Sequence, residues 1–157
     1  MTGQSMLDKI IDLLKEKGVT FEHLIHEPTP TSKDSSKVRG TKMEEGIKAI
    51  ILRGKKTKEN YMICLPSNLR IDMKAVAAQT GEAVEFEDPE KIKEKYGLVI
   101  GGVPPFGNLL GIKTFFDSKI KNEERAVFNA GLQTDSILMK SKDLIDTVDP
   151  MLGDFSK

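Results

Sequence analysis

Residues 46–66, GIKAIILRGKKTKENYMICLP, form the stretch of sequence that decides the fold. The stretch contains two apolar runs, residues 47–52 and 61–65, which are rich in residue types that favour strands. The polar link between them, residues 53–60, includes Gly54 and three lysines. This pattern predicts a β-hairpin with a long, exposed turn.

Upstream of this hairpin, the pattern predicts a helix and then a strand. Ser5 is a suitable N-cap, a series of apolar residues follows at helical spacing, and Gly18 ends the helix. Residues 19–25 alternate loosely and are expected to form a strand. Residues 29–39 are rich in Ser, Thr, Lys and Pro, and they fit either a short capped helix or a mobile loop.

Downstream of the hairpin, two helices have clear start and stop signals. Asp72 is expected to cap a helix that Gly81 ends, and Asp88 to cap another that ends near residues 96–97. Ser141 is expected to cap a last helix. Apolar runs predict further short strands at residues 98–100, 113–116, 125–129 and 136–139.

Length and element order together indicate the fold class. The chain has 157 residues, which is enough for one hydrophobic core, and it contains no repeat and no linker. Strands and helices are interspersed rather than strictly alternating. The sequence therefore predicts a single compact mixed α/β domain over residues 1–157, with a central mixed β-sheet surrounded by helices.

Composition excludes several classes of protein. Lys and Arg number 24 and so do Asp and Glu, which argues against a general nucleic-acid coat but permits brief contact with one RNA terminus. Cys64 is the only cysteine, so an internal disulfide and a thiolate metal cluster are both excluded. The N-terminal residues lack the features of a secretory signal, and no apolar run approaches the length of a membrane span. We expect a cytoplasmic protein without a membrane partner.

Lys48 is the first candidate site residue. In residues 47–52, alternation places Lys48 on the same face as Ile50 and Leu52. An ammonium on an apolar face costs free energy unless it lies at the rim or faces a polar cavity. Lys48 is therefore either a snorkelling lysine at a strand end or a charge at a pocket mouth, where it would serve a phosphate or a developing oxyanion.

Residues 101–107, GGVPPFG, are the second candidate. Three glycines and two prolines define a loop with little side-chain cover, so the amides of Gly101, Gly102 and Val103 could point at a carbonyl oxygen or an anion. Pro104 and Pro105 cannot donate a hydrogen bond. The segment is neither a Walker loop nor a dinucleotide fingerprint, and a tight structural turn explains it equally well.

The remaining candidates are weaker. Asn129-Ala130-Gly131 is expected to form a simple turn, and His26 fits a polar strand end. The histidines and carboxylates show no metal spacing. Cys64 lies inside an apolar strand, where a buried, inert thiol is the usual outcome, and no serine lies in a nucleophile elbow. A hydrolase with this sequence would attack with water or with a group on the substrate.

Taken in order, these motifs resemble the YbaK-like family of prolyl-tRNA-synthetase-associated editing domains. The resemblance extends from about His26 to about Asp146, most of the chain. The matching motifs are His26-Glu27-Pro28 followed by Thr31, Gly46-Ile47-Lys48, Leu69-Arg70-Ile71-Asp72-Met73-Lys74, Tyr96-Gly97 followed by the glycine–proline loop, Phe128-Asn129-Ala130-Gly131 and Asp143-Leu144.

This resemblance implies an aminoacyl-tRNA deacylase that acts in trans without a metal or other cofactor. It would hydrolyse the ester of a mischarged small amino acid, such as Ala or Cys, at the 3′ end of tRNA, with tRNA(Pro) as the expected carrier and prolyl-tRNA synthetase as a further partner. The resemblance makes Lys48 the catalytic lysine and residues 101–105 the loop that shapes the aminoacyl pocket. The site residues it implies are Lys48, Gly101 and Gly102 for catalysis, and His26, Thr31, Val103, Pro105, Asn129, Gly131 and Asp135 for substrate binding.

Two departures from the family pattern affect which amino acid is edited. Residues 29–39 carry more Lys and Ser than the usual small-apolar helix, and residues 133–135 match only loosely. Two other functions stay open. One is a non-catalytic module that binds an aminoacylated end or a synthetase, and the other is a thiol enzyme that uses an exposed Cys64.

Overall fold

The hairpin of residues 46–66 forms as the sequence predicts. Strands β2 (Ile47–Gly54) and β3 (Asn60–Pro66) pair antiparallel, with Lys48 opposite Leu65 and Leu52 opposite Tyr61. The structure is a computed structural model that describes residues 2–28 and 32–157. The rest of the larger sheet is built on this hairpin.

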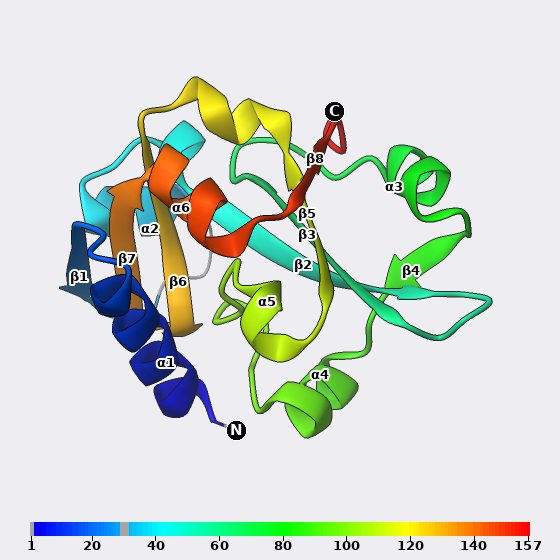
Figure 1. The fold of residues 1–157 in the computed structure, drawn as a ribbon, viewed down its shortest axis with the longest axis horizontal. Coiled ribbons are helices and arrows are strands. Elements are labelled where there is room, and N and C mark those ends of the chain that lie inside the picture. Colours follow the sequence, from blue (N-terminus) through cyan, green and yellow to red (C-terminus); the bar gives the residue numbers. More distant parts are fainter. Residues whose placement is uncertain (1, 29–31) are drawn as a thin grey trace.

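Three further strands extend the hairpin into a five-stranded mixed sheet (Figure 1). β4 (Val84–Phe86) pairs antiparallel with β2, whereas β5 (Lys113–Asp117) runs parallel to β3 and β8 (Met151–Gly153) parallel to β5. Parallel neighbours require crossover connections, which usually carry helices. The elements around this sheet are α3 (Met73–Thr80), α4 (Pro89–Tyr96), α5 (Gly107–Leu110) and the 3-10 helix η2 (Ser118–Asn122).

A second, three-stranded antiparallel sheet has the order β1-β7-β6. Its strands are β1 (Phe21–Ile25), β7 (Asp135–Lys140) and β6 (Arg125–Leu132). α1 (Gly3–Glu16) packs in front of these strands in Figure 1, and α2 (Ser32–Arg39) lies behind them. The face toward α1 carries Phe128 and Ala130, which belong to the main core. Successive strand residues point to opposite faces, so Asn129 lies on the α2 face.

The two sheets meet along one edge of β2. Just after the 3-10 helix η1 (Met43–Glu45), Gly46 forms a parallel bridge with Val127 of β6. β4 joins the same edge only at Ile51, whose carbonyl accepts the Glu87 N–H at 3.1 Å. Between these points, residues 48–50 have no strand neighbour on this edge within the described residues. The sheet therefore has an opening beside the first half of β2.

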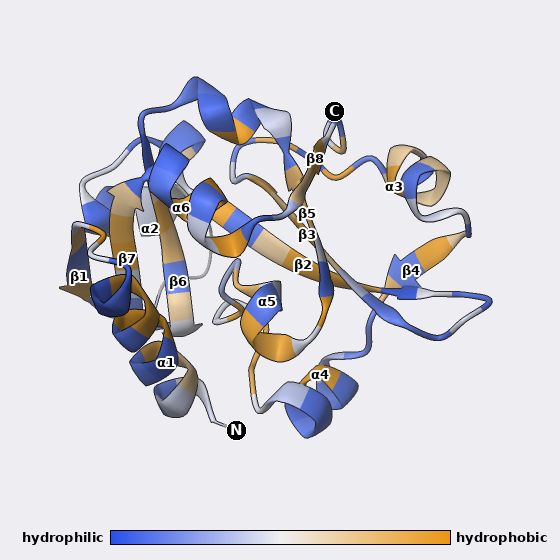
Figure 2. Ribbon diagram, viewed as in Figure 1, coloured by the Kyte–Doolittle hydropathy of each residue, from blue (hydrophilic) through white to orange (hydrophobic). Residues whose placement is uncertain are grey.

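The five-stranded sheet separates two groups of buried apolar side chains. Met62 and Cys64 of β3 face the larger group, whereas Tyr61 and Ile63 face the smaller one. Figure 2 shows the outcome, with orange strands in the middle of the molecule and a mostly blue or pale turn between β2 and β3. The apolar alternation of the sequence thus places both cores. α1 joins the larger group through Met6, Leu7, Ile10 and Leu14.

The signals for α3 and α4 are confirmed. The Asp72 carboxylate accepts the N–H of Lys74 at 3.1 Å, and Asp88 accepts the N–H of Glu90 at 2.9 Å. Gly81 ends α3 at a φ of 83°, a left-handed conformation that glycine adopts without strain. α2 is likewise a helix, so the described residues 32–39 form the helix rather than the loop of the two alternatives.

Two predicted helix caps are wrong. Thr2, not Ser5, caps α1: the Thr2 hydroxyl accepts the Ser5 N–H at 3.1 Å, and the Ser5 hydroxyl accepts the Thr2 N–H at 2.8 Å. Ser5 therefore occupies the third helical position of a reciprocal capping box. At α6 (Ser141–Val148), Lys140 is the N-cap residue and Ser141 the first helical residue.

Two further expectations about local structure are also wrong. Residues 98–100 form no strand; Leu98 is buried, whereas Val99 and Ile100 are exposed. Asn129-Ala130-Gly131 is not a turn but part of β6, where the pairing register shifts between Asn129 and Leu132. The turn to β7 comes two residues after Gly131.

Candidate active site

A cavity of about 190 Å³ lies at the opening beside β2. Ala49, Ile50 and Ile51 of β2 form one wall. Ile100, Gly101 and Val103 of the glycine–proline loop also line it, as do Phe86, Glu87 and Ile92. The unpaired stretch of strand and the loop predicted to be functional thus enclose one space.

The loop approaches β6 closely. Gly101 has a φ of 92°, and a Cβ added at Gly102 would lie 3.2 Å from the Gly131 carbonyl oxygen. Gly102 donates its N–H to the Val99 carbonyl at 2.9 Å, so this amide is occupied and is not a free oxyanion donor. Within the described part of the chain, the N–H groups of Gly101 and Val103 have no hydrogen-bond acceptor. Of the three loop amides expected to donate a hydrogen bond to substrate, those of Gly101 and Val103 are therefore free to do so.

Two side-chain amides hold the loop on the β6–β7 hairpin. Asn129 Nδ2 donates to the Gly101 carbonyl, and Gln133 Nε2 donates to the Ile100 carbonyl at 2.9 Å. Two consecutive carbonyls are therefore turned toward the hairpin. Of these side chains the sequence indicated Asn129 but not Gln133.

A polar network on the α2 face of the three-stranded sheet continues from Asn129. Arg39 donates from Nη2 to Asn129 Oδ1 at 2.6 Å and from Nε to Ser136 Oγ at 2.9 Å. His26 Nδ1 lies 2.8 Å from the Glu27 carbonyl oxygen and must donate there, because a carbonyl only accepts. His26 Nε2 lies 2.7 Å from Ser136 Oγ. The network joins His26 to the loop by way of Ser136, Arg39 and Asn129.

Arg39 is the member of this network that sequence reasoning missed. Burial lowers the pKa of its guanidinium to about 10, which still leaves it protonated at neutral pH. Its position at the end of a Ser- and Lys-rich segment gave no sign of burial. Ser136 is fully buried and was expected only as the first residue of a strand.

Lys48 leaves β2 on the face opposite to Ala49. Ala49 and Ile51 belong to the larger core, so alternation directs Lys48, like Ile50, to the other side. There the half-buried ammonium has a lowered pKa, because of burial first and the positive charge of Arg70 second. Lys48 precedes Ala49, the first residue of β2 that lines the cavity, but it is not itself among the lining residues. Catalytic contact between Lys48 and the loop stays a prediction.

Asp135 and Gly131 have structural partners. Asp135 lies 2.6 Å from His23 Nε2 and accepts the Thr134 hydroxyl at 2.6 Å. Gly131 has a φ of 99°, and a Cβ there would lie 2.6 Å from the Gly3 carbonyl oxygen. The backbone of α1 thus requires glycine at this position.

Two other predicted binding residues have different outcomes. Pro105 is buried in the structure. Thr31 lies outside the described residues. Two groups of predicted site residues lie together. The polar network described above links His26 through Asn129 to Gly101, and Gly102 lies against the Gly131 carbonyl.

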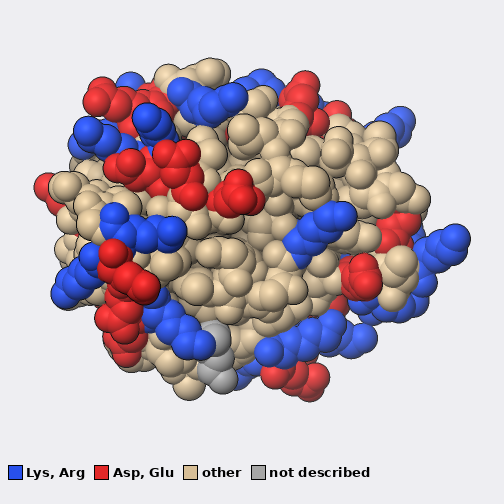
Figure 3. Space-filling view, in the orientation of Figure 1, with Lys and Arg blue, Asp and Glu red and all other residues tan. Residues whose placement is uncertain are grey.

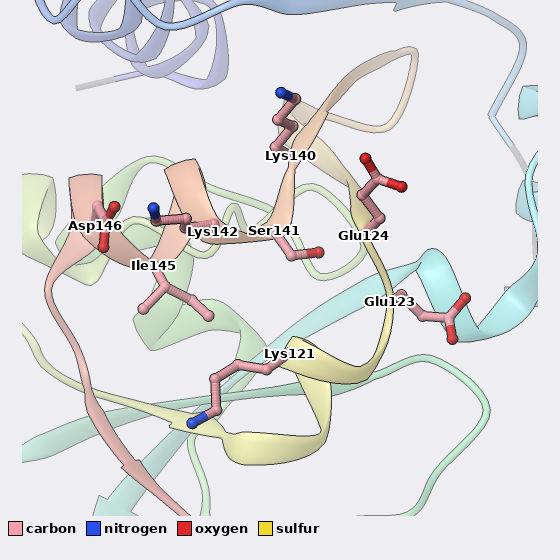
Figure 4. Close-up of a pocket in the computed structure, with 8 residues that line it drawn as sticks. All are labelled: Lys121, Glu123, Glu124, Lys140, Ser141, Lys142, Ile145 and Asp146. Atoms are coloured by element: carbon pink, nitrogen blue, oxygen red, sulfur yellow. The ribbon is translucent and has the colours of Figure 1, made fainter.

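A larger hollow of about 470 Å³ lies beside the start of α6 (Figure 4). None of the predicted site residues lines it. The Ile145 side chain lies left of the centre of the view, and Lys140 and Glu124 point away from it. Its lining charges are mixed in sign, and Glu123 is already paired with Lys42 at 3.0 Å. The hollow therefore favours no ligand of one charge.

The described residues lack two features that would bear on function. They contain no group of three or more His, Cys, Asp or Glu side chains that could hold a metal ion. They also contain no helix with the length and apolar character that crossing a membrane requires. Cys64 is completely buried, and burial raises the pKa of its thiol well above the ordinary value, as expected for an inert cysteine.

The chain matches known proteins over most of its length. The family model for the aminoacyl-tRNA editing domain matches residues 26–147. The multifunctional Ser/Thr-tRNA deacylase ProXp-y of Escherichia coli strain K12 is 26% identical over 159 residues, which cover 99% of this chain and 95% of that one. The prolyl-tRNA editing protein ProX of Acetoanaerobium sticklandii is 20% identical over 140 residues, with 86% and 85% covered.

A solved structure shows the same fold. The crystal structure of a hypothetical protein superposes with a TM-score of 0.86 at 21% identity, covering 95% of this chain and 99% of the other. This confirms the mixed α/β architecture expected from the sequence. The family model spans far more than half of the chain and confirms the resemblance as well. The chain belongs to the aminoacyl-tRNA editing domain family.

Proposed function

We propose that the protein is an aminoacyl-tRNA deacylase that hydrolyses the ester of a mischarged small amino acid in trans. The observation that carries this proposal is the glycine–proline loop, held by Asn129 and Gln133 over a small cavity at the open edge of β2. The loop keeps the amides of Gly101 and Val103 available as donors. Membership of the editing family makes an aminoacyl ester the substrate that this arrangement fits.

The chemistry needs little from the protein beyond positioning. An aminoacyl ester is already activated, so hydrolysis depends on holding the carbonyl in place and stabilising the oxyanion. Two amide donors can stabilise that oxyanion, and Lys48 would add a positive charge for it or for the nearest phosphate. Water, the neighbouring ribose hydroxyl or the substrate's own side chain would attack. The burial of Cys64 argues against the thiol enzyme.

The size and lining of the cavity support a small amino acid. Its volume of about 190 Å³ is below the usual range of drug-sized pockets, roughly 300–1,000 Å³. Ala or Cys on tRNA(Pro) is the substrate we propose. Ser and Thr form the second candidate pair, because the Escherichia coli relative is named a Ser/Thr-tRNA deacylase. The largely apolar lining favours the first pair.

Contact with tRNA is proposed to be local and brief. Figure 3 shows Lys and Arg side chains at the right edge, over the β2–β3 turn, and along the lower right, near α4. On the rest of this face both signs of charge are interspersed. Such a surface guides an RNA end without gripping a whole tRNA. A synthetase such as prolyl-tRNA synthetase would supply further affinity, and the cytoplasm is where both would meet.

The test is a panel of mischarged tRNAs incubated with purified protein. Ala, Cys, Ser and Thr esters are compared on tRNA(Pro), and the controls are Pro-tRNA(Pro) and the same four amino acids on their own tRNAs, which are correctly charged. We expect release of at least one small amino acid well above the spontaneous rate, and none of proline. Binding of the tRNAs without release of any amino acid would support the non-catalytic module instead.

A further inference from the structure

We propose that Arg39 is a positioning residue, which orients the Asn129 side chain so that Asn129 holds the glycine–proline loop in its working shape. The proposal deepens the proposed function and rests on it, because the working shape is the one that leaves the amides of Gly101 and Val103 free for substrate. It assigns to α2 a role in shaping the site.

The hydrogen-bond pattern gives Arg39 control over which way the Asn129 amide faces. A protonated guanidinium carries five donors and no acceptor. Arg39 Nη2 lies 2.6 Å from the end group of Asn129, so the Asn129 atom that faces it must be the oxygen. The amino group of Asn129 must then face the other way, toward the Gly101 carbonyl to which it donates. Without Arg39, only two neutral contacts would favour this orientation, the one to the Gly101 carbonyl and the one from Ser136 Oγ to Asn129 Oδ1 at 3.2 Å.

The guanidinium of Arg39 contacts Ser136 and Asn129 at once and in a fixed geometry. Arg39 Nε donates to Ser136 Oγ of β7 at 2.9 Å while Nη2 reaches Asn129 of β6. The rigid guanidinium presents these donors in a fixed fork, whereas a lysine ammonium is a single point on a flexible stem. The fork therefore holds the guanidinium itself in one place, and the Asn129 oxygen with it.

The contact matters because it acts on the backbone of the loop. Asn129 draws the Gly101 carbonyl toward β6, and the next amide, Gly102, donates to the Val99 carbonyl at 2.9 Å. Releasing the Gly101 carbonyl would allow this peptide to rotate, since glycine tolerates many conformations. Gln133 would still hold Ile100, so the loop would lose its shape locally without leaving the hairpin.

Two variants separate the steps of this relay. Arg39→Met removes both donors but keeps an unbranched stem. Asn129→Asp keeps an acceptor for Arg39 and Ser136 but cannot donate to the Gly101 carbonyl. The matched control is Arg125→Gln. Arg125 lies on β6, the strand of Asn129, but at the end away from the loop, where it pairs with Glu45 at 2.8 Å.

Two readouts are needed. The first is single-turnover release from the preferred mischarged tRNA, with the KM measured separately. We expect Arg39→Met and Asn129→Asp each to lower the rate constant on the order of 10²-fold with little change in KM, as for a displaced catalytic group. The second is hydrogen exchange of the Gly102 amide by NMR, which should become faster in both variants. Arg125→Gln should change neither, and Arg39→Lys should restore only part of the rate.

Opposite outcomes would overturn the proposal. A wild-type rate and wild-type Gly102 exchange in Asn129→Asp would show that the loop does not depend on the Asn129 donor. A rise in KM for Arg39→Met that grows with salt, with Gly102 exchange unchanged, would assign Arg39 to a substrate phosphate instead. If the wild-type protein releases no amino acid from any tRNA, the proposed function fails, and Gly102 exchange still decides whether Arg39 holds the loop.

Discussion

Replacing Lys48 by alanine tests whether this lysine takes part in the chemistry. The side chain is half-buried, and the charge that acts on its ammonium is the like charge of Arg70. An anion bound beside Lys48 would therefore be stabilised by both positive charges. If that anion is the oxyanion of the reacting ester, losing Lys48 should resemble losing an oxyanion donor. We expect Lys48→Ala to lower the rate of deacylation on the order of 10²-fold or more.

Folding should be hardly affected by the same change. Burial and Arg70 lower the pKa of Lys48, so the folded protein holds this proton less tightly than the unfolded chain does. The resulting penalty is fully present below the lowered pKa, and it is relieved as the pH rises through that pKa. Removing the ammonium removes the penalty and some stem packing together. We expect the free energy of unfolding to change by less than about 1 kcal/mol.

The deciding assay is single-turnover release of amino acid from mischarged tRNA at saturating enzyme, which excludes effects on binding. Lys74→Ala, at an exposed lysine of α3, is the control and should keep the wild-type rate. Lys48→Arg should also be slow, because a planar guanidinium does not replace a compact ammonium in a shaped site. Equal rates for the wild type and Lys48→Ala would refute the catalytic assignment and leave the loop amides as the sole oxyanion donors proposed.

Three more predictions concern other parts of the molecule. Cys64→Ala should keep nearly full activity at a cost of about 1 kcal/mol at most in denaturant unfolding, and loss of turnover in a folded variant would restore the thiol enzyme. Hydrogen bonds lower the pKa of Glu82 to about 2, and those from the hydroxyls of Thr57 and Tyr61 contribute most. The charge of Glu82 therefore stabilises the fold at pH values above the ordinary pKa of 4.5, and this stabilisation is lost as the pH falls toward 2. Unfolding midpoints of Glu82→Gln and the wild type should therefore differ most at neutral pH and converge in acid, and a constant difference would contradict this. The last change replaces the three lysines of the β2–β3 turn, Lys55, Lys56 and Lys58, by alanine. It should weaken tRNA affinity and reduce its salt dependence, as measured by tRNA titration at two salt concentrations, and leave turnover at saturation unchanged.

The parts of the fold that sequence predicts correctly are those whose signals are local and redundant. The β2–β3 hairpin has two apolar runs and a polar link, and α3 has both a capping carboxylate at Asp72 and a stop at Gly81. Local signals are ambiguous where two neighbouring residues can both cap a helix: Thr2 and Ser5 can each serve as the N-cap of α1, and Thr2 is the one that does. β4 and β8 have three residues each, too few to show alternation, and they exist because β2 and β5 offer an edge to pair with.

The site was only partly predictable for a related reason. Gly101 and Gly102 stand out in the sequence because glycines and prolines cluster there. Nothing in the local sequence shows that the Gly102 N–H donates to the Val99 carbonyl. Arg39 could not be found at all, since its role depends on Asn129, 90 residues away in the chain. A half-buried arginine looks like any other charged residue of a polar segment until the sheet beside it is known.

The opening beside β2 explains why the loop and the part of β6 that it contacts both need glycine. β6 reaches β2 only at Gly46, and β4 pairs with it from Ile51, so the loop fills the place where a strand is missing. To lie there it must pass within contact distance of β6, and the register shift in β6 brings the Gly131 carbonyl against Gly102. A side chain on Gly102 would press on that carbonyl, and one on Gly131 would press on α1. Asn129 is the last regularly paired residue before this shift, opposite Ser136, so strand alternation keeps its side chain on the α2 face, from which its amide holds the loop.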